Sequence, residues 1–237
     1  MPKAIIIGAS SGIGKAMALL LAANDFTVGI TGRRSEELEA IKQRSPEQFV
    51  VRCFDCTKAD NVYELETLTK ELGGLDLLML SAGTGDLNEA LDIGIETRTN
   101  QLNVMAFTKI AGWTYNFFKV QGKGHLVAIT SIGGLRGSKM APAYNASKAY
   151  QLNYLEGLRQ KAQSEGKKVT VTDIRPGFVD TAMVKGPGQF WVAPPEKAAR
   201  QMYKHIRNKR AVAYVTHRWR LIAMILKWMP GSIYQRL

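Results

Sequence analysis

Short apolar runs alternate along the chain with longer segments in which apolar side chains recur every three to four positions. The short runs are typical of buried strands, and the longer segments are typical of helices that cover a sheet. The expected strands span residues 3–8, 26–31, 49–54, 75–80, 124–130, 168–174 and 211–215. The expected helices span residues 12–23, 35–45, 58–72, 92–119, 142–165 and 195–207. This alternation predicts an α/β fold with a Rossmann-type, doubly wound parallel sheet of about seven strands, flanked by helices.

The length of 237 residues suits a single domain of this class, and neither a repeat nor a linker interrupts the pattern. We expect one nucleotide-binding unit over residues 1–215, with residues 216–237 as a C-terminal extension of the same domain. Hydrophobic residues make up 46% of the chain, which is enough to build a large core.

Positive charge is concentrated at the C-terminal end. The formal net charge is +12, and the region from Lys197 to Leu237 holds ten Lys or Arg residues but no Asp or Glu. The rest of the chain is therefore close to neutral. No apolar stretch of about 18 residues predicts a transmembrane helix. The start, Met1-Pro2-Lys3, leads into a strand without the apolar core of a signal peptide, so we expect a cytoplasmic protein.

The C-terminal extension predicts an amphipathic helix. Its apolar stripe consists of Trp219, Ile222, Ala223, Leu226 and Met229. Tryptophan with flanking cations is typical of an interfacial helix, so peripheral membrane contact is one interpretation. A helix that covers a pocket or a subunit interface shows the same stripe, and we prefer this interpretation because dimer burial also hides it. Nucleic-acid binding is not favoured, because the arginines are interleaved mainly with aliphatic rather than stacking residues.

The two cysteines, Cys53 and Cys56, have the spacing of a redox pair or of half a zinc site. They lie at the end of an expected strand, where positions three apart point to opposite faces. No second pair and no suitable histidine spacing accompanies them. We therefore expect ordinary structural cysteines and no metal site.

A glycine-rich turn follows the first expected strand and leads into a helix. It reads Gly8-Ala9-Ser10-Ser11-Gly12-Ile13-Gly14. Glycines at such a turn let the backbone approach a pyrophosphate, and the helix N-terminus offers free N–H groups. The same glycines also suit an ordinary turn, so the motif alone is weak evidence.

The second expected strand is followed by Gly32, Arg33 and Arg34. An NAD enzyme usually has an acid where Gly32 stands, to bind the ribose 2′-hydroxyl. A guanidinium instead binds a 2′-phosphate, with Arg33 as the main expected contact. Two arginines that simply begin a solvated helix are the alternative. With the preceding turn, the pattern favours NADP(H) over NAD(H).

Tyr144 and Lys148 are four positions apart on an expected helix, so both side chains lie on one face. A phenol with a pKa near 10 transfers protons poorly at neutral pH, and a nearby ammonium favours the phenolate. Tyr144 is therefore the expected acid in reduction and base in oxidation. Alone, the pair is weak evidence for a proton-transfer site, because chance pairs at this spacing are common and usually face solvent.

Several motifs, in the same order between residues 8 and 181, resemble those of the short-chain dehydrogenase/reductase family. Besides the glycine turn and the Tyr144-x-x-x-Lys148 pair, they are Asp55-Cys56, Ser81-Ala82-Gly83, Asn103, Ser131 and the segment Pro176-Gly177-Phe178-Val179-Asp180-Thr181. Leu80 and Ser81 depart from the family's two asparagines. Because Ala82 and Gly83 act through their backbone, this departure leaves their expected role intact.

The resemblance implies a role for each matching position. Asp55 and Cys56 would contact adenine, while Ala82, Gly83, Pro176, Gly177, Val179 and Thr181 would hold the rest of the dinucleotide. Ser131 would polarise the substrate carbonyl, and Lys148 would hold the nicotinamide ribose and tune Tyr144. Asn103 would hold a water that connects Lys148 to solvent.

The function expected from the sequence is an NADPH-dependent oxidoreductase that reduces a ketone or aldehyde, or oxidises the alcohol, with Tyr144 as acid/base. The alternative is a non-catalytic NADP-binding sensor or scaffold. The substrate is a small carbonyl or alcohol compound, with lipid-like and acyl compounds among the candidates. In the expected lid, residues 182–191, Met183, Phe190 and Trp191 either form apolar walls or pack the lid onto the domain. The family commonly forms dimers or tetramers through the helices that carry Asn103 and Tyr144, so a homo-oligomer is expected.

Overall fold

The computed structural model describes residues 1–183 and 189–236. Within this part of the chain lies a seven-stranded sheet whose neighbouring strands are all parallel, in the order β3-β2-β1-β4-β5-β6-β7. The strands are β1 (Lys3–Ile7), β2 (Thr27–Gly32), β3 (Phe49–Cys53), β4 (Leu77–Leu80), β5 (Lys123–Ile129), β6 (Lys168–Pro176) and β7 (Val212–Val215). The predicted strands all occur, each within two residues of its predicted bounds, which confirms the fold class.

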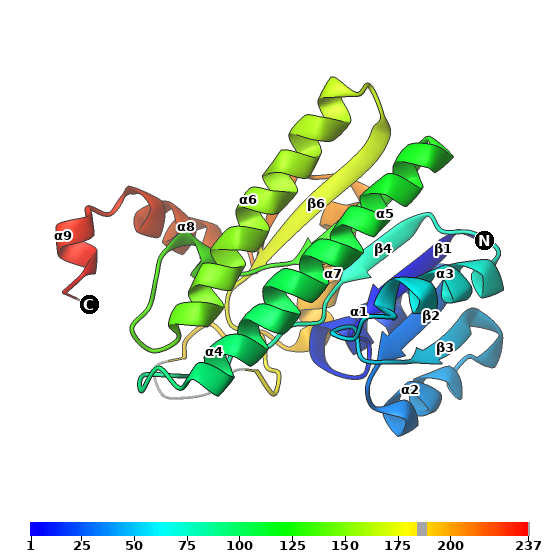
Figure 1. Ribbon diagram of the computed structural model, residues 1–237, viewed down its shortest axis with the longest axis horizontal. Coiled ribbons are helices and arrows are strands. Elements are labelled where there is room, and N and C mark those ends of the chain that lie inside the picture. Colours follow the sequence, from blue (N-terminus) through cyan, green and yellow to red (C-terminus); the bar gives the residue numbers. More distant parts are fainter. Residues whose placement is uncertain (184–188, 237) are drawn as a thin grey trace.

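Helices cover both faces of the sheet. They are α1 (Gly12–Ala22), α2 (Ser35–Lys42), α3 (Asn61–Leu72), α4 (Ile93–Asn100), α5 (Phe107–Gln121), α6 (Pro142–Ser164) and α7 (Pro195–Arg207). Successive side chains of a strand point to opposite faces. Ala4 and Ile6 of β1 accordingly pack with α1, α2 and α7, whereas Ile5 and Ile7 pack with α3, α5 and α6. Figure 1 shows α5 and α6 crossing one face of the sheet. Because both faces are buried, the strands need apolar residues at almost every position.

The single helix expected over residues 92–119 is divided in the structure. Between α4 and α5 the chain forms a π-helical segment, η2 (Gln101–Ala106). The wider π turn carries Asn103, which is completely buried. Its side chain accepts a hydrogen bond from the Thr84 backbone N–H (3.0 Å) and donates one to the Thr84 carbonyl (2.8 Å). Such π segments often occur at functional sites. Apolar periodicity does not reveal them, because the helix continues on either side.

The C-terminal extension forms α8 (Trp219–Trp228) and α9 (Gly231–Tyr234), which extend from the body of the domain (Figure 1). Arg136, next to the short helix η3 (Ile132–Leu135), donates to the carbonyl oxygens of Leu226 (2.8 Å) and Met229. Carbonyls at a helix C-terminus lack intrahelical partners, so Arg136 caps α8. Trp219 and Ala223 of the predicted stripe are buried and its other members are half-buried, so the stripe faces the protein. Among the described residues, no helix combines the length and apolar character needed to cross a bilayer.

Candidate active site

A cavity of about 760 Å³ opens at the carboxyl ends of the parallel strands. Residues at the ends of β1 to β6, or just after them, form its walls. β1 and β4 are neighbours in the sheet although two strands separate them in sequence. At such a switch point the connections leave in opposite directions, and the crevice between them is where doubly wound folds bind ligands.

Most of the residues that the sequence predicts for the site line this cavity. They are Gly8, Ser10, Ser11, Gly12, Ile13, Arg33, Arg34, Asp55, Cys56, Ala82, Gly83, Ser131, Tyr144, Lys148, Pro176, Gly177, Val179 and Thr181. Two predicted residues, Gly14 and Asn103, do not line the cavity and are buried. A Cβ at Gly14 would stand 2.0 Å from the Gly8 carbonyl oxygen, so this glycine lets α1 pack closely against the turn.

The turn after β1 requires glycine at its first position. Gly8 has a φ of +87°, and a Cβ there would stand 2.7 Å from the backbone nitrogen of Ala82. This close approach joins the end of β1 to the segment after β4 at the cavity floor. Among the described residues, no side chain caps the N-terminus of α1, and its first turn carries no acid. The free N–H groups and positive dipole end of α1 therefore suit an anion.

Arg33 and Arg34 are both exposed at the rim of the cavity but contact different groups. Arg34 donates to the hydroxyl oxygens of Ser10 (2.9 Å) and Ser11 (2.7 Å) in the glycine turn. Arg33 lies on the side of Asp55. Burial would raise the pKa of the Asp55 carboxyl, but hydrogen bonds from Thr57 and the charge of Arg33 hold it below its ordinary value. The rim thus combines two cations with the hydroxyls of a phosphate-type turn.

Tyr144, on the first turn of α6, meets Ser131 at the end of β5. The Ser131 side chain acts on the Tyr144 phenol and favours its phenolate, so the two groups are neighbours. Asn145, the next residue on α6, donates to the carbonyl oxygens of Gly133 (2.8 Å) and Arg136 (2.9 Å) and so ties the η3 loop to the helix. Ser131 itself accepts from the Gly133 N–H (2.9 Å). These bonds set the position of the Ser131 hydroxyl against the phenol.

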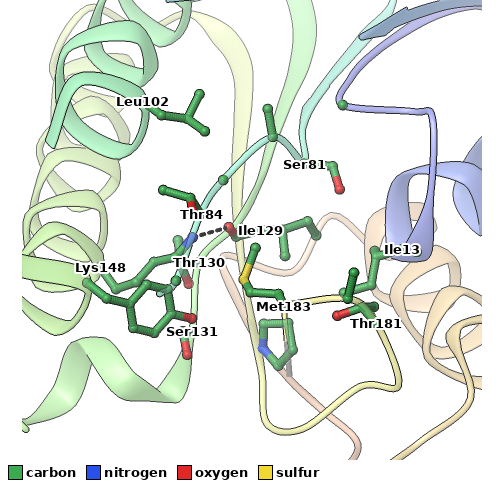
Figure 2. A pocket seen from close by; sticks show the side chains of 18 of the residues that line it. Ile13, Ser81, Thr84, Leu102, Ile129, Thr130, Ser131, Lys148, Thr181 and Met183 are labelled. Carbon is green, nitrogen blue, oxygen red and sulfur yellow. Dashed lines mark hydrogen bonds between the residues drawn. The ribbon is translucent and has the colours of Figure 1, made fainter. Parts of the chain in front are cut away.

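Lys148 lies one turn further along α6, with its ammonium 5.8 Å from the centre of the Tyr144 ring. It is 3% exposed and donates to the carbonyl oxygen of Ile129 at 3.1 Å. Figure 2 shows Lys148 reaching this carbonyl, with Ser131, Met183 and Thr181 lining the same pocket. The structure therefore brings Ser131, Tyr144 and Lys148 together at one wall of the cavity.

Burial changes the pKa values of both members of the Tyr144–Lys148 pair. It raises the pKa of the Tyr144 phenol above its ordinary value, against the opposing effect of the Ser131 hydrogen bond. It also lowers the pKa of Lys148 to about 8, although the charge of Asp173 acts in the other direction. The sequence predicts a phenol pKa lowered by the ammonium, but burial of Tyr144 has the larger effect and raises the pKa. Burial thus favours the uncharged form of both groups.

Sequence reasoning missed Gln151, one turn beyond Lys148. Its side-chain oxygen accepts a hydrogen bond from the Lys148 ammonium (3.1 Å), and its NH₂ group donates to the backbone carbonyl of Asn103 (2.8 Å). Gln151 thus contacts both the Lys148 ammonium and the backbone of Asn103. The i,i+3 spacing on α6 is the one signal that pointed to this contact.

Trp219, from the C-terminal extension, lines the cavity. The sequence placed it in a stripe that covers a pocket or a subunit interface, but did not name it as a site residue. A Cβ at Gly177 would stand 2.0 Å from its indole ring, so only glycine leaves room for this packing. Of the expected lid residues, Met183 lines the cavity, whereas Phe190 and Trp191 pack on Trp219, with ring centres 5.0 and 6.0 Å away. The middle of the expected lid, residues 184–188, lies outside the described residues.

The two cysteines are free thiols in different surroundings. β3 ends at Cys53, which is exposed, and Cys56 belongs to the following loop and lines the cavity. Burial raises the pKa of the Cys56 thiol to about 11. Cys56 is therefore a neutral thiol at physiological pH rather than a reactive thiolate.

Comparison with known proteins shows the family to which this chain belongs. Residues 2–189 match the family model described as short chain dehydrogenase. The chain belongs to the short chain dehydrogenase family. Family membership makes the protein an oxidoreductase and implies a nicotinamide dinucleotide cofactor. Trp219 and α8 lie beyond the residues that match the family model.

Relatives and solved structures agree with this assignment. An uncharacterized oxidoreductase of Myxococcus xanthus (strain DK1622) is 34% identical over 190 residues, which cover 76% of this dehydrogenase and 73% of that protein. An uncharacterized oxidoreductase of Staphylococcus aureus (strain MW2) is 33% identical over 188 residues, 76% of this chain and 79% of its own. A short chain dehydrogenase from Bacillus anthracis has a TM-score of 0.80 at 21% identity, over 90% of this chain and 94% of that one. The apo form of LigD from Sphingobium sp. strain SYK-6 has a TM-score of 0.83 at 19% identity, over 100% and 97% of the two chains. At such low identities the two structures show a shared fold.

Proposed function

We propose that this dehydrogenase is an NADPH-dependent reductase of ketones or aldehydes that also oxidises the corresponding alcohols. The observation that carries the proposal is the meeting of Ser131, Tyr144 and Lys148 in the same cavity as the glycine turn and the two arginines. Proton-transfer groups and a dinucleotide-type cradle thus face one space. The remaining walls include Phe178, Met183 and Trp219, which favours an apolar group on the substrate.

The residues present fit a phosphorylated dinucleotide. The uncapped N-terminus of α1 suits the pyrophosphate, and Arg33 and Arg34 suit a 2′-phosphate. A Cβ at Gly32 would stand 3.2 Å from the Ser10 hydroxyl oxygen, so a longer acidic side chain would be crowded by the turn that Arg34 contacts. When bound, the cofactor supplies the hydride that reduces the carbonyl carbon.

The wall residues supply and hold the proton. Tyr144, whose pKa is raised by burial, donates its proton to the carbonyl oxygen as negative charge develops there. The Ser131 hydroxyl donates a second hydrogen bond to the same oxygen. Alcohol oxidation requires the phenolate instead, so its rate should rise with pH toward the raised pKa of Tyr144, whereas reduction should be favoured at lower pH.

The alternative of a non-catalytic NADP-binding sensor or scaffold shares the cofactor cradle but has no need of the wall residues. The hydroxyl, phenol and ammonium groups are all present in the lining of one cavity. We therefore prefer the enzyme.

Paired titration of the purified protein with NADPH and NADH, followed by nicotinamide fluorescence, tests the proposed cofactor. We expect NADPH to bind at least about tenfold more tightly, because a charge-assisted hydrogen bond contributes about 1.5–3 kcal/mol. A screen of ketones and aldehydes with NADPH then tests turnover. Equal binding of the two cofactors would contradict the NADP preference, and binding without turnover of any carbonyl would favour the sensor or scaffold.

We also propose that the protein forms a homodimer or homotetramer through η2, α5 and α6. Met105 on η2 and Tyr150 on α6 are large exposed side chains on this side of the molecule. The Tyr150 and Thr108 hydroxyl groups, from α6 and α5, are hydrogen-bonded at 2.7 Å, so the two helices present one surface. Sedimentation equilibrium measures the resulting mass directly.

Peripheral membrane contact is proposed for the outer face of α8, which carries a second apolar stripe. Leu221, Met224, Ile225 and Trp228 are exposed at i, i+3, i+4 and i+7, and Trp228 is 82% exposed. Arg220 and Lys227 lie seven residues apart and so follow one edge of this stripe. Tryptophan, aliphatic side chains and cations on one helix suit an anionic lipid surface. Pairing with α8 of a second copy is disfavoured, because it would bring two positively charged surfaces together.

Cosedimentation with vesicles tests this contact. The protein should pellet with vesicles that contain about a third phosphatidylglycerol, and less so with pure phosphatidylcholine or at high salt. The double substitution Leu221→Ser, Ile225→Ser should reduce binding at least about tenfold, because each removed side chain loses about 1–2 kcal/mol of apolar transfer. Tyr63→Ser, an exposed position on α3, serves as control. Binding that survives the double substitution would place the membrane contact elsewhere.

A further inference from the structure

Gln151 is a buried polar side chain for which neither the family motifs nor the proposed reaction has a role. It is 1% exposed and is not part of the cavity wall. Both ends of its amide are hydrogen-bonded: the oxygen accepts from the Lys148 ammonium, and the NH₂ group donates to the Asn103 carbonyl. A buried amide held at both ends has one orientation, so it sets the position of its neighbours.

The contact with Gln151 limits what Lys148 can do. An ammonium has three N–H donors. One is bonded to the Ile129 carbonyl and one to Gln151, at 3.1 Å each. The third is therefore the donor that remains for the cavity and the Tyr144 side. Without the Gln151 oxygen, the ammonium would keep its bond to the Ile129 carbonyl but would lose a second acceptor that fixes its direction and stabilises its charge.

The far end of the Gln151 amide is attached to a rigid support. The Asn103 side chain is bonded to both backbone groups of Thr84 and donates to the Ser147 hydroxyl at 3.0 Å. Asn103 is itself 0% exposed and lies in the π-helical segment η2. The carbonyl that holds Gln151 is thus anchored by helix α6, by η2 and by the loop after β4.

We propose that Gln151 is a positioning residue that directs the Lys148 ammonium toward the cavity and separates it from solvent on the inner side of α6. The proposal rests on the proposed reductase function. An amide group donates and accepts hydrogen bonds but does not relay protons as a water molecule does, because that would break its C–N resonance. Lys148 therefore gains and loses its proton through the cavity.

The charged and titratable groups around Lys148 are held by contacts that do not involve Gln151. Tyr144 faces it from the same helix, and Asp173 acts on it from β6. The Asp173 carboxylate is paired with Arg175 at 2.7 Å and accepts from the Thr130 hydroxyl at 2.6 Å. A change in the pKa of Lys148 in a Gln151 variant can therefore be attributed to the loss or replacement of the Gln151 amide.

Gln151→Met and Gln151→Glu test the proposal with side chains of similar length. The titration of Lys148 is followed by NMR of protein labelled with ¹³C-lysine, and the resonance is assigned with Lys148→Met. Loss of the neutral acceptor should move the Lys148 midpoint down by about one pH unit in Gln151→Met, and a carboxylate should move it up by at least as much in Gln151→Glu. The pH profile of carbonyl reduction should shift in the same directions.

Gln160→Met and Gln160→Glu, at an exposed position of the same helix, are the matched controls. A purely structural Gln151 would lower the melting temperature of its variants but leave the Lys148 midpoint unchanged, and that result would overturn the proposal. If Gln151→Met does not fold, the proposal is tested by Gln151→Glu alone, in which the Lys148 titration midpoint should move up. Shifted midpoints in a protein without turnover would support the role of Gln151 and reject the reductase.

Discussion

Tyr144→Phe should reduce turnover about 10²–10⁴-fold while NADPH binding stays nearly unchanged. The substitution removes one hydroxyl, the group that lies beside Ser131 and that donates the proton in the proposed reaction. The ring keeps its place above Lys148, so the shape of the cavity wall is preserved. Steady-state rates with a carbonyl substrate and fluorescence titration with NADPH separate the two effects.

Tyr150→Phe, two helical turns from the start of α6, is a matched control. Its hydroxyl is bonded to Thr108 on the outside of the helix pair, so its loss should leave turnover close to that of the parent protein. Turnover that persists in Tyr144→Phe would reject Tyr144 as the acid. Lost NADPH binding would instead mean that the phenol contributes to the cofactor site.

Arg33→Ala should weaken NADPH binding about ten- to a hundredfold and change NADH binding little. The side chain is exposed at the cavity rim, and its loss removes a charge-assisted contact to a 2′-phosphate, a contact of about 1.5–3 kcal/mol that NADH lacks. Titrations of the variant with each cofactor, at the same ionic strength, measure the two losses.

Arg34→Ala gives an informative comparison. Arg34 bonds to Ser10 and Ser11, so its removal disturbs the glycine turn as well as the rim. Its loss should therefore weaken both cofactors, with the larger effect on NADPH. Equal weakening of NADPH and NADH in Arg33→Ala would mean that Arg33 does not bind the phosphate, and a selective NADPH loss in Arg34→Ala alone would assign that role to Arg34.

The sequence predicted the frame of the site because its signals are local. The glycine turn and Arg33-Arg34 follow directly on a strand, and Ser131 follows two residues after one. Parallel strands bring their carboxyl ends to one edge of the sheet. The spacing of Tyr144 and Lys148 places them on one face of a helix whatever that helix packs against. Gly14 shows the limit of this reasoning. Its position in the motif is as expected, but it packs behind the turn instead of lining the cavity.

Local sequence patterns did not predict the contacts between segments that are far apart in the chain. The predicted stripe of α8 favours a pocket or a subunit interface over a membrane but does not choose between the first two. Only the packing of Trp219 on Gly177 shows that its first residue lines the cavity. α8 carries a second apolar stripe on its opposite, exposed face. That stripe indicates a binding surface only because the predicted stripe already packs against the protein. Periodicity counts apolar positions but does not tell which face finds a partner.

The amino-acid sequence by itself determined the strand order along the chain, the cofactor-type turn and the proton-transfer pair, because each depends on residues a few positions apart. The tertiary structure decided the π turn at Asn103, the bridge from Asn103 to Lys148 through Gln151, and the opposite pKa changes of Tyr144 and Lys148. The physical reason is that desolvation and hydrogen-bond pairing are set by groups far apart in the chain, such as Gln151 and Asn103 at a separation of 48 residues. These contacts exist only once the sheet and its two helical layers have assembled.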